Sequence, residues 1–328
     1  MKGFAVAPAK VILTGEHFVV YGTTAIVAAV NIHSKATVSQ RSDGTIVVSS
    51  SSPRCSVSFT DGYCEVLQGR RNTRAMLEPI CHVARATLEH FDKEKQGLDI
   101  QIDSAIPVGV GLGSSAAVAV STIAATAKLL RRGLDRDAIR HLAFKSESMI
   151  HNFPSGIDQT ISTLGGLIAY RRRRPFQRIP LKRTFQVIIG DTRRTRSTGA
   201  MVSKVKTLLA KGRRLKRQIL RSAERISRTA LTTLQHGDMR QFGELMNLNH
   251  ELLRQVRVST RELDRLVLAA REAGAFGAKL TGAGGGGCMI ALAPFRYTES
   301  VLHAISDAGG TPHLVNVQRE GVESWLLI

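Results

Sequence analysis

Residues 107–117 read Pro-Val-Gly-Val-Gly-Leu-Gly-Ser-Ser-Ala-Ala, a glycine-rich turn that ends in two hydroxyls and continues into an apolar helix. Glycine reaches φ > 0 and lets the backbone approach a ligand closely, because it has no Cβ. The helix that begins near Ser114 offers unpaired N–H donors and a partial positive charge at its first turn. The stretch therefore predicts a phosphate cradle, with a nucleotide phosphate as its ligand.

The turn differs from the best-known phosphate-binding loops. No Lys follows Gly113, so no side chain can act as the lysine of a P-loop, and the third Gly comes one position too early for Gly-x-Gly-x-x-Gly. A purely structural turn therefore stays open as the alternative. The residues expected to form the nucleotide cradle are Pro107, Gly109, Gly111, Leu112, Gly113, Ser114, Ser115 and Ala116.

Two further segments combine short apolar strands with glycine turns. Residues 10–22 read Lys-Val-Ile-Leu-Thr-Gly-Glu-His-Phe-Val-Val-Tyr-Gly, which predicts a strand, a Gly-Glu-His turn and a second strand. Residues 279–288 read Lys-Leu-Thr-Gly-Ala-Gly-Gly-Gly-Gly-Cys and precede the strand-like residues 289–292. Three such segments in this order resemble the three motifs of the GHMP small-molecule kinases, named for galacto-, homoserine, mevalonate and phosphomevalonate kinases. The resemblance spans nearly the whole chain.

Within that superfamily the chain is most similar to the archaeal-type mevalonate kinases. The strings that carry this similarity lie at residues 15–22, 149–158 (Met-Ile-His-Asn-Phe-Pro-Ser-Gly-Ile-Asp) and 277–287. Residues 191–198 also resemble the substrate-side stretch of that subfamily, although Gly199 stands where some relatives carry a charged residue. The resemblance implies ATP- and Mg²⁺-dependent phosphorylation of the 5-hydroxyl of mevalonate, and we expect a homodimer.

Other functions stay open beside this one. Another kinase of the superfamily, for phosphomevalonate, homoserine or a sugar, is the main alternative. A diphosphomevalonate decarboxylase fits less well, because Glu147 and the string at 149–158 favour plain phosphorylation. A non-catalytic relative that binds nucleic acid through a basic face is a minor alternative, which the intact Lys10, Ser115, Glu147 and Asp158 disfavour.

The resemblance also assigns roles to residues, since phosphoryl transfer needs a phosphate cradle, Mg²⁺ ligands, a base and groups that orient the acceptor. Asp158 is implied as the catalytic base, with Lys10 beside it to offset charge on the transferred phosphoryl group. Ser115 and Glu147 are implied as the Mg²⁺ ligands, a sparse oxygen set of the kind that Mg²⁺ prefers. The residues implied to contact the acceptor are Glu16, His17, Ser155, Thr198, Gly282 and Ala283.

The residues taken alone permit simpler explanations. Asp158 suits a helix N-cap before residues 159–161, and a lysine such as Lys10 is ordinarily a surface residue. His17 could be a buried histidine that backbone groups satisfy. The four consecutive glycines at 284–287 could form a tight turn, place bare backbone against a phosphate, or do both.

The coarse pattern alternates strands and helices. Strands are predicted at 4–7, 10–13, 35–40, 45–50, 98–102, 186–190, 278–281 and 287–292, and helices at 73–92, 114–131, 135–149, 201–233, 238–254 and 260–273. This α+β layout matches the two-domain fold that the resemblance implies. Residues 1–172 would form an N-terminal domain like ribosomal protein S5, with a left-handed βαβ crossover, and residues 173–328 a ferredoxin-like domain. The active site is expected between them.

Composition fits a folded enzyme. The chain has 328 residues, 43% of them hydrophobic, with nine prolines, which disfavours disorder. We find no secretory leader and no membrane-spanning stretch, so we expect a cytoplasmic protein without membrane insertion. The four cysteines have no Cys-x-x-Cys spacing, which favours free thiols, although a Cys55–Cys64 disulfide across a hairpin is an alternative.

The positive charge is concentrated in one segment. Residues 171–228 contain 20 Lys and Arg against Asp191 and Glu224, which accounts for +18 of the net charge of +20. Arg171–Arg174 is expected at the domain junction, and apolar residues recur at helical spacing from Val202 onward. A solvated helix face is the favoured interpretation, ahead of steering of anionic substrates. Binding of nucleic acid or anionic lipid is the least favoured, because aromatic side chains for base stacking are scarce here.

Overall fold

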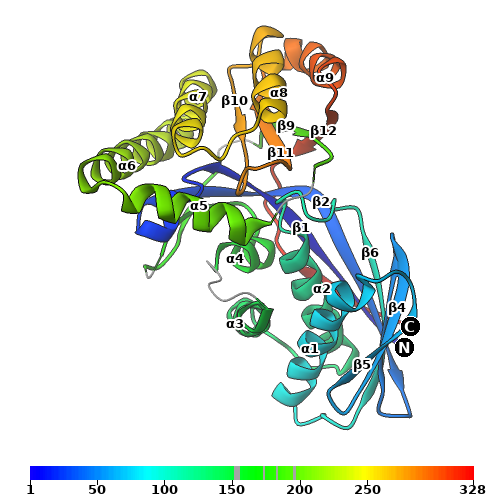
Figure 1. The fold of residues 1–328 in the computed structure, drawn as a ribbon. Helices are drawn as coiled ribbons and strands as arrows, with labels where there is room; N and C mark the ends of the chain where they lie inside the picture. The colour runs from blue at the N-terminus through cyan, green and yellow to red at the C-terminus, as the bar shows by residue number, and fades with distance from the viewer. Residues whose placement is uncertain (151–155, 173, 182–183, 195–196) are drawn as a thin grey trace.

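The computed structural model contains two β-sheets with helices packed on them (Figure 1). It describes residues 1–150, 156–172, 174–181, 184–194 and 197–328. Within these ranges the larger sheet has the strand order β13-β1-β2-β6-β3-β4-β5, with β7 and β8 attached beside β2, and the smaller sheet has the order β10-β11-β9-β12. Mixed sheets with separate helices confirm the α+β fold class.

The larger sheet is built around two long antiparallel strands, β1 and β2. Its strands are β1 (Lys2–Thr14), β2 (Thr24–Arg41), β3 (Ile46–Ser51), β4 (Arg54–Thr60), β5 (Tyr63–Gln68), β6 (Gly97–Ser104), β7 (Leu167–Arg171), β8 (Gln177–Ile179) and β13 (Glu323–Leu327). In β1 burial alternates up to Val6 and is then continuous from Ala7 to Thr14. The second half of β1, which carries the first motif, is therefore covered on both faces.

Helices α1 (Thr73–His90), α2 (Ser114–Leu129), α3 (Arg136–Ile150) and α4 (Ile157–Leu164) lie together in the half that contains the larger sheet (Figure 1). Helix α2 packs directly on β1 and β2. Its inner face consists of small residues such as Ala117 and Ala125, which are fully buried. A Cβ placed on Gly3 would lie 2.0 Å from the carbonyl oxygen of Ala125, so small residues on both elements permit this close contact.

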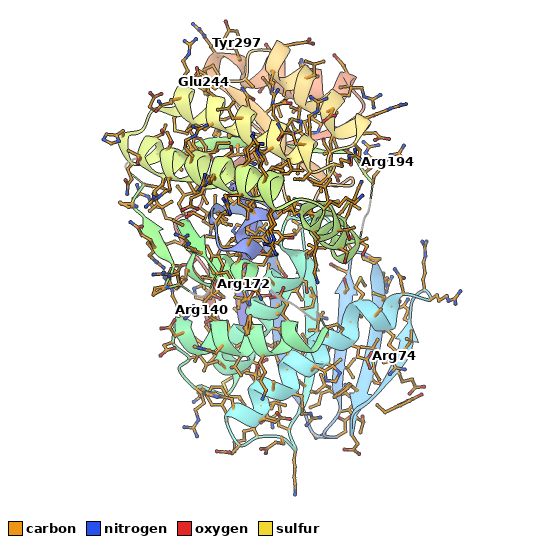
Figure 2. The ribbon with its side chains drawn as sticks, turned by 60° about the vertical axis from the view of Figure 1, so that its left-hand side comes forward. Arg74, Arg140, Arg172, Arg194, Glu244 and Tyr297 are labelled. Carbon is orange, nitrogen blue, oxygen red and sulfur yellow. The ribbon has the colours of Figure 1, made fainter. Side chains whose placement is uncertain are left out.

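The smaller sheet and most remaining helices form the other half, where Glu244 and Tyr297 lie, whereas Arg74 marks the opposite end (Figure 2). The strands are β9 (Gln186–Asp191), β10 (Gly277–Leu280), β11 (Cys288–Leu292) and β12 (Thr311–Asn316). The helices are α5 (Thr198–Ala210), α6 (Arg213–His236), α7 (Met239–Gln255), α8 (Arg261–Glu272) and α9 (Thr298–Asp307). Short 3₁₀ helices are η1 (Phe18–Tyr21) and η2 (Phe295–Tyr297).

Three sequence-based element predictions are corrected. The helix predicted over 201–233 is two helices, because Gly212 has an extended backbone (φ −160°) between α5 and α6. The second strand predicted in the first motif is η1, and β2 begins only at Thr24. The strands predicted at 4–7 and 10–13 form one strand, since β2 continues as a partner across the register shift between Pro8 and Ala9.

The predicted domain boundary falls near the passage from the larger to the smaller sheet. Two later strands nevertheless belong to the larger sheet: β8 pairs with β7, and β13 pairs with β1 in antiparallel register from Lys2↔Leu327 to Val6↔Glu323. The end of the chain thus returns to the sheet in which it began. The division into domains at 172 and 173 stays a prediction.

The four thiols are buried in the core, and none of them forms a disulfide. The predicted hairpin disulfide between Cys55 on β4 and Cys64 on β5 is therefore not formed, and the interpretation without disulfides is confirmed. Among the described helices, none is both long and apolar enough to cross a membrane.

Candidate active site

The glycine-rich turn connects β6 to α2 as the sequence predicts. Gly109, Gly111 and Gly113 have φ values of 79°, 93° and 79°, in the left-handed region that glycine tolerates. Between them the side chains of Val110 and Leu112 are buried. The apolar side chains therefore anchor the turn in the core while the glycines present bare backbone. Helix α2 begins at Ser114 with Gly113 as its N-cap residue, and no side chain caps it, which leaves its first N–H groups for a ligand.

The turn is fixed to the first motif through Lys10. The backbone N–H of Lys10 donates to the carbonyl of Leu112 at 2.9 Å. A Cβ on Gly113 would lie 2.8 Å from Cγ of Lys10, so the Lys10 side chain passes directly against the turn. A glycine at this position is therefore needed for the contact as well as for its positive φ.

Lys10 and Asp158 form an ion pair at the end of this turn. The Lys10 Nζ lies 3.2 Å from Oδ1 of Asp158, and the two side chains are 5% and 30% exposed. Asp158 is the second residue of α4, whose N-cap is Gly156 with φ 81°, so the N-cap explanation of Asp158 is wrong. The surface explanation of Lys10 is also wrong. A nearly buried cation beside a partly open carboxylate is suited to proton transfer next to a charged phosphoryl group.

Glu147 brings a second carboxylate to this place. Its Oε2 is buried and has no hydrogen-bond partner among the described residues. Burial, and next the negative charge of Asp158, raise the pKa of Glu147 to about 7, while Lys10 opposes the shift. A buried oxygen without a donor, near a second acid, is the environment that a bound cation would stabilise. Ser115 lies exposed in the first turn of α2 and offers a further hard oxygen.

The first and third motifs meet through His17 and Ala283. The His17 side chain is buried, and its Nε2 is 2.8 Å from the carbonyl oxygen of Ala283, so this nitrogen carries the hydrogen. His17 also has φ 59°, an uncommon conformation for a residue other than glycine. Gly282 precedes the contact with φ 79°. The structure therefore brings together three of the residues predicted to contact the acceptor.

The Glu16 side chain is buried and is not available to a ligand. Its Oε1 pairs with Nζ of Lys279 and its Oε2 accepts a hydrogen bond from Nδ2 of Asn249 at 3.0 Å, with both charged side chains fully buried. Burial raises the pKa of Glu16 and lowers that of Lys279, and each charge opposes the shift of the other. The contact with the acceptor predicted for Glu16 does not fit this position, because both carboxylate oxygens are already used. Glu16 instead joins the first motif to β10.

The remaining acceptor-side predictions have different outcomes. Thr198 is the first residue of α5, exposed to solvent, and the helix is capped by Ser197, whose side chain accepts from the N–H of Ala200. Ser155 lies outside the described residues.

The glycines of the third motif pack against neighbouring backbone. The N–H of Gly285 donates to the carbonyl of Val258 at 2.7 Å, and the N–H of Gly287 donates to the backbone carbonyl of Arg194 at 2.8 Å. A Cβ on Gly284 would lie 2.2 Å from the Val258 oxygen. The structural explanation of this loop is therefore supported at Gly284–Gly287, whereas Gly282 and Ala283 face the first motif.

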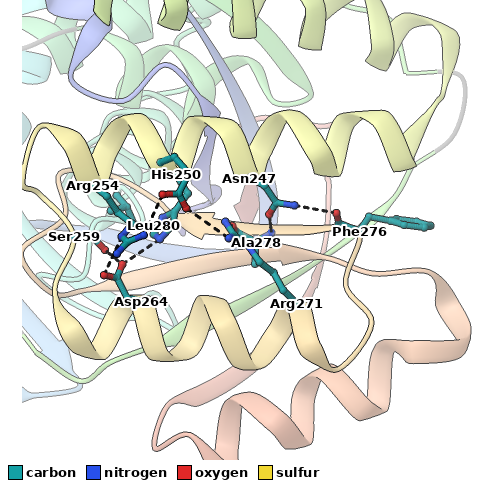
Figure 3. A network of polar contacts seen from close by, with 10 residues as sticks. Asn247, His250, Arg254, Ser259, Asp264, Arg271, Phe276, Ala278 and Leu280 are labelled. Atoms are coloured by element: carbon teal, nitrogen blue, oxygen red, sulfur yellow. Dashed lines mark hydrogen bonds and ion pairs between the residues drawn. The ribbon is translucent and has the colours of Figure 1, made fainter.

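A polar network behind β10 holds the third motif in place (Figure 3). The Nδ1 of His250 accepts from the N–H of Leu280 at 3.3 Å, so Nε2 carries the hydrogen and donates to Oδ1 of Asp264 at 3.1 Å. Asp264 Oδ1 also accepts a hydrogen bond from Oγ of Ser259 at 2.5 Å, and its Oδ2 forms an ion pair with Nε of Arg254 at 3.3 Å. Helices α7 and α8 thus fix the strand that leads into the Lys279–Gly287 loop.

We predict that this network weakens in acid. Burial, and next the charge of Arg271, lower the pKa of His250 to about 4, against 6.5 when unfolded. A lowered pKa means that the unfolded chain binds the proton first, so stability is complete above pH 6.5 and falls as the pH drops toward 4. The difference between the two pKa values corresponds to about 3 kcal/mol in the free energy of unfolding. Urea denaturation between pH 8 and pH 4 measures it.

His250→Asn is the matched variant for this measurement, because its amide oxygen can still accept from Leu280 but does not titrate. Its stability should fall less between pH 6.5 and 4 than that of the parent. Equal pH dependence of both proteins would show that His250 is not the group responsible.

Several supporting residues were missed by sequence reasoning. Asn249 is fully buried on α7, and its side chain both accepts from the N–H of Gly15 at 3.3 Å and donates to Glu16. Asn249 and His250 occupy the buried face of α7, next to Leu252 and Leu253. Polar residues at positions that helical spacing assigns to the core were the available signal. Their partners could not be identified without the tertiary structure.

Comparison with known families agrees with this geometry. The family described as GHMP kinases N terminal domain matches residues 79–166, and the family described as GHMP kinases C terminal matches residues 230–310. These matches cover the phosphate turn, Glu147 and Asp158 in the first case and Asn249, Lys279 and Ala283 in the second. The chain belongs to the GHMP kinase family. ATP as co-substrate follows from that membership.

Individual members of the family that are similar to this chain include several mevalonate kinases. The mevalonate kinase of Pyrococcus horikoshii is 41% identical, covering 97% of this chain and 96% of its own. That of Aeropyrum pernix is 33% identical with the same coverage. Among solved structures, the Methanococcus jannaschii mevalonate kinase has a TM-score of 0.84 at 30% identity, covering 96% of this chain and 98% of its own. The L. major mevalonate kinase in complex with R-mevalonate has a TM-score of 0.82 at 28% identity, covering 96% of both chains.

Proposed function

We propose that this GHMP kinase transfers the terminal phosphoryl group of ATP to the 5-hydroxyl of mevalonate. Full-length similarity to mevalonate kinases supports the acceptor. The observation that carries the chemistry is the Lys10–Asp158 pair, which lies against the glycine turn and near Glu147, whose Oε2 has no hydrogen-bond partner among the described residues.

In this proposal Asp158 accepts the proton of the acceptor hydroxyl as the oxygen attacks the phosphoryl group. Its 30% exposed side chain is open to a ligand, and its position inside α4 leaves the carboxylate free of a capping role. Lys10 orients Asp158 through a charge-assisted hydrogen bond and offsets negative charge on the transferred group. The hydroxyl becomes nucleophilic only as its proton leaves, so the two events are coupled.

The nucleotide phosphates are proposed to lie on the turn from Pro107 to Ala116. The bare backbone at Gly109, Gly111 and Gly113 and the uncapped start of α2 supply N–H donors there, together with the hydroxyls of Ser114 and Ser115. No lysine of the P-loop type is present, so Lys10, which reaches the turn from β1, is the cation next to the phosphates.

The proposal includes Mg²⁺, held by Glu147 and Ser115. The buried Oε2 of Glu147 fits a cation, because it has no donor among the described residues and a carboxylate is a preferred ligand of Mg²⁺. When bound, the ion supplies charge neutralisation of the phosphates. The protein's contribution is to keep the Glu147 carboxylate buried and close to Asp158, whose charge raises its pKa further.

On the acceptor side, His17 with Gly282 and Ala283 forms the wall that joins the first and third motifs. We propose that this wall contacts mevalonate, with Thr198 and Ser155 as further contacts. Glu16 is proposed to support it through Lys279 and Asn249 without touching the acceptor.

A substrate panel tests the function. Purified protein with Mg-ATP should release ADP with the highest kcat/KM for mevalonate, ahead of phosphomevalonate, homoserine and galactose. A site built to pair a carboxylate and two hydroxyls penalises ligands that leave its polar groups unmatched. Equal or better turnover of homoserine or galactose would favour another kinase of the family instead.

The Mg²⁺ site is tested by Glu147→Gln. The Mg²⁺ concentration for half-maximal rate should rise about tenfold or more and kcat should fall, since even an outer-shell change commonly costs that much metal affinity. Glu89→Gln, on an exposed position of α1, is the matched control and should leave both values unchanged. An unaltered Mg²⁺ dependence in Glu147→Gln would assign the ion to another acid.

Two broader expectations stay predictions. A homodimer is tested by sedimentation of the purified protein across a concentration series. A cytoplasmic location is tested by cell fractionation.

A further inference from the structure

A groove with basic walls runs along α6. This helix lies at the outer edge of the molecule (Figure 1). It has a volume of about 740 Å³, and its far wall consists of Tyr21, Gly22, Thr23 and Arg171. A second hollow of about 690 Å³ shares part of the same helix surface. The residues that line both are Arg213, Arg217, Arg221 and Arg225.

These four arginines, the α6 row, stand at intervals of four residues on exposed positions of one helix. At 1.5 Å per residue, neighbours in the row are about 6 Å apart along the axis and the whole row spans about 18 Å. Like charges at this spacing repel one another and disfavour the helix. A ligand that places negative charge along the row would remove this repulsion.

The protein itself supplies little negative charge here. Glu224 is the acid of the groove, and it pairs with Arg171 at 3.5 Å and with Arg228 at 3.8 Å. Its Oε2 also accepts from the N–H of Thr24 at 2.8 Å. In the part of the chain that the structure describes, no ion pair joins the α6 row to an acidic side chain. The row is thus uncompensated while its neighbours are paired.

We propose that this groove binds a linear chain of phosphates, as in the backbone of a single nucleic-acid strand. One strand of a duplex has a phosphate every 3.4 Å along its axis, so a length of about 18 Å presents about five of them to the α6 row. The groove is distinct from the cradle at the start of α2, and the inference does not depend on the kinase reaction.

The residues that line the groove favour contact with the phosphate backbone of a nucleic-acid strand over contact with its bases. Tyr21 is the aromatic side chain of the groove, and its ring is covered by Nζ of Lys216, 5.2 Å from the centroid. Lys216 thus occupies one face of the ring, which disfavours stacking of a base on that face. Leu215, 46% exposed, is the large apolar side chain that α6 offers to solvent along its described length, which is too little for insertion into a bilayer. A membrane surface is therefore the less favoured partner.

Binding of a short fluorescent oligouridylate, followed by anisotropy over a salt series, tests the proposal. The parent should bind at low salt, and the logarithm of its affinity should fall with the logarithm of salt with a slope of about −3, as four neutralised phosphates require. Replacing all four arginines of the α6 row with Gln keeps good helix formers and should reduce affinity at least about tenfold. Kinase activity of this variant should equal that of the parent, which confirms its fold.

The matched control removes the same charge elsewhere, by replacing Arg70, Arg71, Lys93 and Lys95 with Gln on exposed positions of the other half. It should retain oligouridylate binding. If the control loses as much affinity for oligouridylate, the effect is one of net charge and the proposed site is wrong. Absence of binding by the parent protein would also refute the proposal. Inorganic polyphosphate should displace the oligouridylate; failure to do so would show that bases are read. Binding to anionic vesicles without binding to the strand would assign the groove to a membrane.

Discussion

Replacing Asp158 with Asn should lower kcat by roughly 10²- to 10⁴-fold, the usual contribution of a general base. The amide keeps the shape of the side chain but cannot accept the proton of the acceptor hydroxyl. The α4 position does not depend on the carboxylate, because Gly156 is the N-cap residue. Affinity for Mg-ATP, measured by equilibrium binding, should therefore change little while turnover is lost.

Asp307→Asn is the control for this prediction, since Asp307 is exposed at the end of α9 in the other half. Its turnover should equal that of the parent. A separate Lys10→Met variant should also lose turnover, because the cation that orients Asp158 is removed. Near-normal turnover of Asp158→Asn would refute the assignment of this residue as the base.

Replacing Lys279 with Met should lower the free energy of unfolding by about 3–5 kcal/mol, the usual cost of leaving one partner of a buried ion pair alone. Lys279 and Glu16 are both fully buried, and Nζ of Lys279 also donates to the carbonyls of Ile12 and Leu280 at 3.3 and 2.6 Å. The substitution therefore leaves a carboxylate and two carbonyls without their donor. Urea denaturation at neutral pH measures the loss.

A second substitution distinguishes the ion pair from simple packing. In Lys279→Met with Glu16→Gln, the buried charge is gone while an amide oxygen still faces Asn249, so part of the stability should return. Lys211→Met, at an exposed position, should cost less than about 0.5 kcal/mol. If the double variant is no more stable than Lys279→Met, the charge of Glu16 is not what destabilises the single variant.

The local architecture of the phosphate turn could be predicted from sequence. Glycines at 109, 111 and 113 followed by an apolar run specify a turn and a helix start, and α2 begins at Ser114 as expected. The helix stop at Gly212 was overlooked, although a glycine between two basic helical runs is a break signal. The η1 segment was taken for a strand because Phe18–Val20 has the composition of one, and its turn geometry depends on His17 at positive φ.

The catalytic pair shows where sequence reasoning needed a resemblance. Lys10 and Asp158 are 148 positions apart, and nothing in the spacing of either segment places one against the other. Similarity to a known family supplied that pairing, and the packing of α4 and α2 on β1 produces it. Glu16 illustrates the opposite case, because its place in a motif suggested contact with the acceptor while packing against α7 and β10 buries it completely.

By itself, the sequence determined many of the strands and helices, the glycine turn before α2 and the strong charge of residues 171–228, because these depend on neighbours within a few positions along the chain. Only the tertiary structure decided which polar groups are paired. It assigned Lys279 and Asn249 to Glu16, left Oε2 of Glu147 without a donor among the described residues, and set the α6 row without an acidic partner among them. Such pairings depend on how elements distant in sequence pack, and burial then makes each paired or unpaired charge energetically significant.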